Sequence, residues 1–137
     1  MIDVEIIGRI KNKNKVQEMC SNILSDLLPR VRRNVEVTIN LVTESDNQAC
    51  GYCLGNKNGA TIELARRSFG IKFSYQELML ILCHELVHAK QFIKGELTDH
   101  PTWMGLPAGH FALIDQPWEI EAFELEEILY NKYAIQE

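Results

Sequence analysis

Apolar and polar residues alternate most regularly over residues 34–42, NVEVTINLV. A period of two places the odd-numbered Val, Ile and Leu residues on one side of an extended chain, which predicts a half-buried strand. A shorter apolar run predicts another strand over residues 4–10. Residues 51–65 predict a hairpin, because the connecting GNKNG contains Asn and Gly, which tolerate the positive φ of tight turns. We therefore expect the first half of the chain to supply a small sheet.

Two segments near the ends of the chain carry apolar residues at helical spacing. The first covers residues 12–28 and ends before Pro29. The second starts near Pro117, which suits a first helical turn because proline lacks an N–H, and continues to about Tyr133. We expect each of these helices to bury one apolar stripe.

A third helix is predicted between Ser74 and Gly95. The Ser74 hydroxyl and the Glu77 carboxylate, three residues later, can form a capping box at its start. Glycine is the common residue just after a helix, so Gly95 marks its end. Residues 78–83 are apolar on every side, which places this helix in the middle of the molecule and not on its surface.

These elements predict an α+β fold. We expect a small, twisted, mainly antiparallel sheet packed on the central helix, with an N-terminal and a C-terminal helix completing the structure. The 137 residues suit one domain, 1–137, since a single core serves chains of this size. Hydrophobic residues at 46% and charged residues at 24% are those of a globular protein and exclude a disordered chain.

Charge is unevenly distributed. The net charge is -5, and residues 73–137 contain 3 Lys/Arg against 11 Asp/Glu. This acidic balance suits a cation site and makes a nucleic-acid partner unlikely, since such partners require clustered basic residues. The N-terminal residues lack the basic and apolar regions of a secretion signal, so we expect a cytoplasmic protein with four free thiols and no membrane partner.

The chemistry-bearing motif is His84-Glu85-Leu86-Val87-His88, the pattern H-E-x-x-H, within the central helix. Residues four apart share a helix face, so both imidazoles can reach one zinc ion at about 2.0–2.1 Å. Glu85 would face the open coordination position as the general base that takes a proton from a metal-activated water. An exposed, merely polar helix face is the alternative, but the apolar segment just before the motif argues against it.

A catalytic zinc normally has three protein ligands, so one more ligand must come from later in the chain. Glu119, Glu121, His100 and His110 are the candidates. Glu119 and Glu121 lie on opposite edges of the predicted apolar stripe of the last helix, so only one of them can face the metal. Helix geometry alone does not choose between them.

HELVHAKQFIKGELTD, the later Trp103-Met104-Gly105 and the segment PWEIEAFELE resemble the small phage-encoded, SprT-like metallopeptidases. The resemblance covers about residues 78–127 and implies a zincin-like fold with one Zn2+ per chain, in a host cytoplasm. It also implies that Glu119 is the third ligand, in an E-x-x-A setting with Ala122. SprT itself uses a third histidine soon after the motif, which would be His100.

Two further patterns have a structural and a functional interpretation. Cys50-x-x-Cys53 has the spacing of a zinc knuckle or a redox pair, but a knuckle needs a second pair, so free thiols are the expectation. The predicted strand Thr61–Leu64 precedes the metal helix. It is either an ordinary strand or an edge strand that pairs with an extended substrate.

The sequence thus predicts an enzyme, a zinc-dependent metallopeptidase acting on a protein or peptide substrate. His84, His88 and Glu119 would hold the metal and Glu85 would be catalytic, while Tyr130 and His110 are candidates for stabilising an oxyanion. Two alternatives remain: a zinc-containing binding or regulatory module without peptidase activity, and a hydrolase of a non-protein amide. The second remains because the motif predicts attack on a carbonyl group but does not identify the molecule that contains it.

Overall fold

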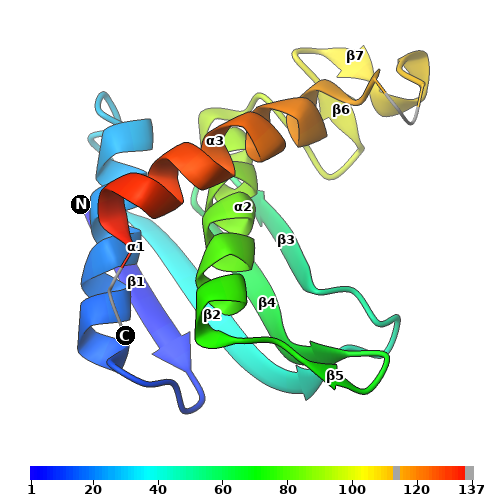
Figure 1. Cartoon of the computed structure of the whole chain (residues 1–137). Helices are drawn as coiled ribbons and strands as arrows, with labels where there is room; N and C mark the ends of the chain where they lie inside the picture. The colour runs from blue at the N-terminus through cyan, green and yellow to red at the C-terminus, as the bar shows by residue number, and fades with distance from the viewer. Residues whose placement is uncertain (113–114, 135–137) are drawn as a thin grey trace.

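The computed structural model describes residues 1–112 and 115–134. Its fold is α+β, with three α-helices, a five-stranded sheet and a separate two-stranded sheet (Figure 1). In chain order the elements are β1 (Ile2–Ile7), α1 (Lys13–Leu27), β2 (Val35–Glu44), β3 (Gly51–Asn56), β4 (Gly59–Ser68), β5 (Ile71–Lys72), α2 (Tyr75–Lys94), β6 (Thr102–Trp103), β7 (Leu106–Pro107), the short 3-10 helix η1 (Ala108–His110) and α3 (Pro117–Tyr133).

The large sheet has the strand order β1-β2-β4-β3, with β5 paired to the end of β4. β1 is parallel to β2 and β2 is parallel to β4, whereas β3 and β5 are antiparallel to β4. The prediction of a mainly antiparallel sheet is therefore wrong, because the sheet is mixed. The crossover through α1 returns the chain to the end of the sheet at which β1 begins, so β2 runs parallel to β1. The next strand, β3, does not pair with β2; β4 pairs with β2 instead and also runs parallel to it.

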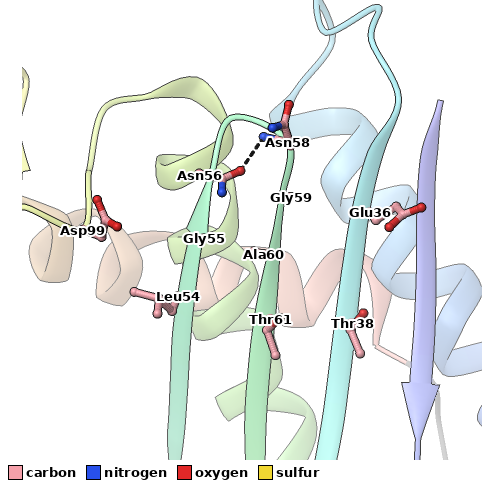
Figure 2. Close-up of a pocket in the computed structure, with 10 residues that line it drawn as sticks. All are labelled: Glu36, Thr38, Leu54, Gly55, Asn56, Asn58, Gly59, Ala60, Thr61 and Asp99. Atoms are coloured by element: carbon pink, nitrogen blue, oxygen red, sulfur yellow. Dashed lines mark hydrogen bonds between the residues drawn. The ribbon is translucent and has the colours of Figure 1, made fainter.

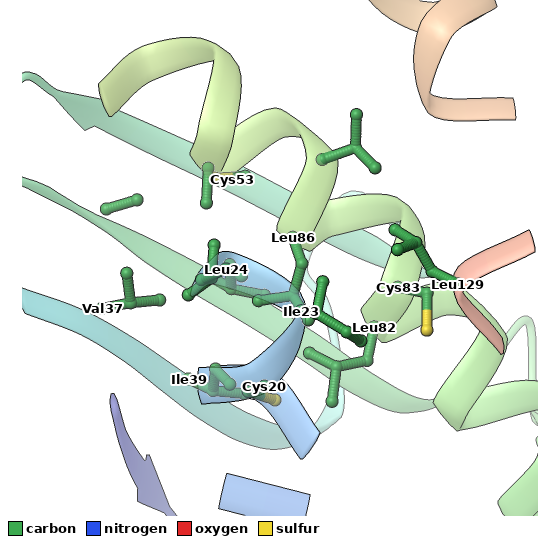
Figure 3. Packing of buried hydrophobic residues seen from close by; sticks show 14 of the residues in the cluster. Cys20, Ile23, Leu24, Val37, Ile39, Cys53, Leu82, Cys83, Leu86 and Leu129 are labelled. Carbon is green, nitrogen blue, oxygen red and sulfur yellow. The ribbon is translucent and has the colours of Figure 1, made fainter. Parts of the chain in front are cut away.

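The sheet buries one face against α1 and α2 (Figure 1). The alternation predicted for β2 is confirmed, since Val35, Val37 and Ile39 are buried and Glu36 is exposed. The predicted stripe of α1 is also buried against this face, as Figure 3 shows for Cys20, Ile23 and Leu24. β1 is shorter than predicted at its end, because Gly8 adopts a φ of 114° and turns the chain out of the sheet.

α2 occupies the middle of the molecule, in contact with β3, β4, α1 and α3. The predicted capping box is present: Glu77 N–H donates to Ser74 Oγ at 3.1 Å, and Ser74 N–H donates to Glu77 Oε1 at 2.8 Å. Gly95 ends the helix with a φ of 77°, a conformation that favours glycine. Local sequence thus sets both ends of the helix that carries the H-E-x-x-H motif.

α3 crosses α2 on the side away from the sheet (Figure 1). Its predicted stripe packs inward, with Ala122 and Leu129 buried and Trp118 and Leu125 partly buried. The small side chain of Ala122, fully buried, permits a close approach of the two helices. No helix in the described part of the chain is long and apolar enough to cross a membrane.

Candidate metal centre

His84 and His88 lie one turn apart on α2, and their rings meet at one point. Nε2 of His84 is 3.2 Å from Nε2 of His88, and the two side chains are only 12% and 11% exposed. A ligand atom of Glu85 lies within 4.8 Å of both. Because α2 is regular here, the four-residue spacing in the sequence is sufficient to produce this geometry. The His-Glu-x-x-His cluster could hold a metal ion.

Glu119, in the first turn of α3, faces both histidines. Its Oε1 lies 2.6 Å from Nε2 of His88 and 3.1 Å from Nε2 of His84. Three potential ligand atoms from two helices therefore lie within 3.2 Å of one another. That a metal is bound by these three residues stays a prediction, but the structure brings Glu119, and not Glu121, to the histidines.

The other ring nitrogen of each histidine also has a partner. Nδ1 of His84 lies 3.3 Å from Oε1 of Glu126, and Nδ1 of His88 lies 2.8 Å from Oε1 of Gln91. Both partners have acceptor oxygens, so Nδ1 of each imidazole donates a hydrogen bond. In its neutral form each imidazole then has its lone pair on Nε2, directed toward Oε1 of Glu119, and this arrangement favours a cation at the centre, either a proton or a metal ion.

Neither of these partners follows from the sequence motif. The acidic residues Glu124, Glu126 and Glu127 form a pattern typical of a solvated helix face, but the side chain of Glu126 is only 16% exposed, so that interpretation is wrong for this residue. It lies two turns after Glu119, and this seven-residue spacing is the signal that could have assigned it to the same face of α3. Gln91 lies three residues after His88, a spacing that allows side-chain contact on α2.

Electrostatics in the cluster favour a positive charge. Burial by itself lowers the pKa of His84 and of His88, but hydrogen bonds to Glu119 and the nearby charge of Glu85 outweigh burial, so both pKa values are raised. The hydrogen bonds from His84 and His88 hold the pKa of Glu119 well below its usual range. A proton and a metal cation would compete for these lone pairs, since metal ligation requires neutral imidazoles and an ionised carboxylate.

Glu85 is buried, with 6% of the residue exposed. Burial raises the pKa of its carboxyl group, and the neighbouring His88 and His84 partly oppose that rise. A general base works best when its pKa is close to the working pH, and burial moves Glu85 in that direction. The position and electrostatics of Glu85 fit the role that the motif predicts.

A hollow of about 220 Å³ opens beside the cluster. One wall is β3 and the other is the start of α3, and its lining is mostly uncharged: Gly51, Tyr52, Cys53, Glu85, His88, Phe92, Leu97, Trp118 and Glu119. β3 pairs with β4 on one side and, among the described residues, with no strand on the other. The free strand edge therefore borders the hollow beside Glu85.

The suggestion that Thr61–Leu64 is the edge strand is wrong. This segment belongs to β4, which pairs with β2 on one side and with β3 on the other. Its backbone groups are used within the sheet, so an extended substrate cannot pair with it. β3, the first strand of the same predicted hairpin, takes the edge position.

The remaining candidate residues lie elsewhere. His100 is exposed and lines a different hollow with Gly55, Lys57 and Gly95. The ring of His110 makes an edge-to-face contact with Phe111, and Tyr130 borders a hollow next to Glu126. Neither lines the hollow that contains Glu85 and His88. The structure thus offers no support for His100 as a ligand, or for His110 or Tyr130 as oxyanion stabilisers.

Glu121 and the C-x-x-C pair also have clear positions. Glu121 accepts hydrogen bonds from Lys90 and from Gln91, and Gln91 in turn contacts His88. Cys50 is exposed and Cys53 is buried, and both are free thiols. The C-x-x-C spacing forms neither a disulfide nor part of a metal cluster in the described residues.

Another hollow, of about 440 Å³, lies on the open face of the sheet beside the β3–β4 turn (Figure 2). Its labelled residues are short polar, apolar and glycine residues together with Glu36 and Asp99. Asn58 N–H donates to Asn56 Oδ1 at 2.8 Å, which stabilises the turn itself. No histidine or cysteine lines this hollow, so its residues do not form a candidate metal cluster of the kind found on α2.

Comparison of the chain with protein-family models, with curated proteins and with solved structures found no match. The function is therefore inferred from the motif and from the geometry of the residues around it. What they establish is a His-Glu-x-x-His group, on a buried helix, that could bind a metal.

Proposed function

We propose that this protein is a zinc-dependent metallopeptidase of the SprT-like, zincin type. The observation that carries the proposal is the convergence of the Nε2 lone pairs of His84 and His88 with Oε1 of Glu119, at distances of 2.6–3.2 Å. Three electron-rich atoms at this spacing repel one another unless a proton or a metal cation lies among them. Partners on both Nδ1 atoms keep the lone pairs directed inward.

The donor set supports zinc as the cation. Two imidazoles and one carboxylate are a usual ligand set of catalytic zinc, which leaves one coordination position open. Structural zinc sites, in which protein side chains fill all coordination positions, usually have ligand sets rich in cysteine. Here no cysteine is among the three converging residues, and the carboxylate of Glu85 lines the hollow beside them. Zinc, when bound, would polarise a substrate carbonyl and promote ionisation of a water molecule.

Glu85 supplies the proton transfer in this proposal. Its carboxylate lies beside the cluster without being one of the three converging atoms, so it can accept a proton from water and return it to the leaving amine. Burial raises the pKa of Glu85, which makes it a better proton acceptor near neutral pH. Glu85 thus acts on the reacting groups, while His84, His88 and Glu119 hold the metal.

The edge of β3 supports an extended peptide as the substrate. Gly51, Tyr52 and Cys53 of this strand line the hollow together with Glu85. A free strand edge offers backbone N–H and C=O groups that can pair with an extended chain. This mode of binding would place a backbone carbonyl of the substrate along the wall opposite Glu119.

The test begins with the metal content of the purified protein, followed by cleavage of an unstructured protein such as casein with and without a chelator. We expect one zinc per chain and chelator-sensitive cleavage. Glu85→Gln should keep the zinc and lose at least about a hundred-fold in rate, the usual contribution of a general base. Glu124→Gln, on an exposed part of α3, is the matched control and should leave the rate unchanged.

Two outcomes would overturn the proposal. A Glu85→Gln variant as active as the unaltered protein would remove Glu85 from the chemistry. A zinc-loaded protein that cleaves no protein or peptide would leave a binding or regulatory role for the metal.

A further inference from the structure

Gln91 is fully buried on α2 and contacts the candidate centre from outside. Its Oε1 accepts a hydrogen bond from Nδ1 of His88 at 2.8 Å. Its Nε2 donates to the backbone carbonyl of Trp118 at 2.9 Å and to Oε1 of Glu121 at 3.0 Å. All three contacts reach groups that border or form the cluster.

These contacts allow only one orientation of the Gln91 amide. Both hydrogens of the amide nitrogen meet acceptors, the carbonyl of Trp118 and the carboxylate of Glu121. If the amide were rotated by half a turn, its oxygen would face these two acceptors and no hydrogen bond could form. The amide oxygen must therefore face Nδ1 of His88 and accept its proton.

Glu121 is itself held in place by Lys90. The Lys90 ammonium lies 2.8 and 2.9 Å from the two oxygens of Glu121, and only 6% of Lys90 is exposed. Lys90 also forms an ion pair with Oε1 of Glu96 at 2.8 Å, an oxygen that has no aligned hydrogen-bond donor among the described residues. A buried cation between two carboxylates makes the position of Glu121 costly to change.

We propose that Gln91, held by Glu121 and Lys90, is a positioning residue that orients the His88 imidazole toward the metal position and so sets the metal affinity of the centre. The inference rests on the proposed function, because it assumes that a metal binds at Nε2 of His88. Gln91 lies outside the H-E-x-x-H motif, and its role comes from its contacts with His88 on α2 and with Trp118 and Glu121 on α3.

The hydrogen bond from Gln91 to the carbonyl of Trp118 connects Gln91 to a second part of the site. Trp118 directly precedes Glu119, so a bond to its carbonyl fixes the first turn of α3 next to the third potential ligand. One buried amide therefore orients a ligand on α2 and anchors the backbone beside a ligand on α3. Partners of this kind typically contribute about 10–100-fold to metal affinity.

The experiment measures zinc affinity by competition with a chelator in the full chain and in two variants. Gln91→Leu keeps the volume and burial of the side chain but removes the acceptor. The exchange variant Gln91→Glu/Glu121→Gln keeps an acceptor oxygen for His88 and places at residue 121 an amide that can donate to the carboxylate at residue 91. We expect affinity to fall by about 10–100-fold in Gln91→Leu and to stay closer to that of the unaltered protein in the exchange variant. Gln76→Leu removes an exposed amide from the same helix and is the matched control.

A spectroscopic readout separates positioning from packing. In the zinc-loaded protein the proton on Nδ1 of His88 should give a slowly exchanging, downfield NMR signal, because Gln91 shields it from water. The signal should persist in the exchange variant and broaden or vanish in Gln91→Leu. This measurement on the unaltered protein and the exchange variant remains decisive if Gln91→Leu does not fold.

The possible results distinguish this inference from the proposed function. Equal zinc affinity in Gln91→Leu and the unaltered protein would overturn the positioning role, as would equal losses in Gln91→Leu and the exchange variant. The absence of a protected Nδ1 proton in the zinc-loaded protein would overturn it as well. An unaltered protein that binds no zinc would instead refute the metal centre itself.

Discussion

Gly51 on β3 lies so close to Glu85 on α2 that a Cβ atom at residue 51 would be 2.9 Å from Cγ of Glu85 and 3.1 Å from its Oε2. The same atom would be 3.0 Å from Ile81 on the preceding turn of α2. Carbon atoms do not approach this closely, so a side chain at residue 51 must displace the carboxylate or the strand. The backbone of β3 and the side chain of Glu85, the proposed general base, therefore lie so close together that only glycine fits at residue 51.

Gly51→Ala should consequently reduce peptide hydrolysis by about a hundred-fold, the order expected when a catalytic group moves by about 1 Å. Zinc content should be unchanged, because His84, His88 and Glu119 do not touch this Cβ position within the nearest contacts. Steady-state rates and metal analysis of the variant check both statements. Gly109→Ala, where a Cβ meets no atom within 4 Å, is the control. A Gly51→Ala variant with unimpaired hydrolysis would contradict the proposed position of Glu85 in catalysis.

Glu119→Ala should abolish stoichiometric zinc binding, whereas His100→Ala should leave it intact. The carboxylate of Glu119 is within 3.1 Å of both histidine Nε2 atoms, and His100 lines a different hollow. Elemental analysis of the two dialysed variants distinguishes them. Retention of zinc in Glu119→Ala together with its loss in His100→Ala would reverse the assignment of the third ligand.

Glu126→Ala should weaken zinc binding by about 10–100-fold without abolishing it, because the carboxylate is the partner of Nδ1 of His84 and not one of the converging atoms. The adjacent Glu127 is exposed and provides a matched control in Glu127→Ala. Chelator competition gives the two affinities. Identical values for the two variants would show that Glu126 has no influence on His84.

The capping box at the start of α2 predicts a pH dependence of stability. Hydrogen bonds from the backbone N–H and the side chain of Ser74 lower the pKa of Glu77 below its ordinary value of 4.5. The folded state therefore holds the proton less tightly than the unfolded state, so this stabilisation is present above pH 4.5 and is lost as the pH falls through the folded-state pKa.

Glu77→Gln should reduce the free energy of unfolding at neutral pH and converge with the unaltered protein in acid. Urea denaturation at a series of pH values measures this difference, and a carbon NMR titration of the Glu77 carboxyl group measures the pKa directly. Parallel stability curves for the two proteins across the acid range would contradict the capping contribution.

Local interactions explain which features could be predicted from the sequence. The capping box and Gly95 involve residues close in sequence, so both ends of α2 were predictable without knowledge of the fold. The alternation in β2 and the stripe in α1 were predictable for the same reason, since each depends on the period of one element. The meeting of His84 and His88 belongs to this group as well.

Strand order belongs to a different class of feature. The residue pattern identified the hairpin of β3 and β4 but left open whether Thr61–Leu64, in β4, is an ordinary strand or an edge strand, and the structure places β3 at the edge. Which strand of a hairpin inserts beside β2 depends on the path of the chain across the sheet, and no local period encodes that path. The parallel pairing of β1 with β2 was missed for the same reason, because it follows from the crossover through α1.

By itself, the sequence determined the helix that carries His84, Glu85 and His88, the limits of that helix and the chemistry its side chains can perform. Only the tertiary structure brought Glu119 rather than Glu121 to the histidines, supplied Gln91 and Glu126 as their partners, and set Gly51 against Glu85. The physical reason is that helical spacing is a property of one segment. The rotation and approach of α3 and β3 toward α2, by contrast, depend on how small side chains such as Ala122 and Gly51 let separate elements pack.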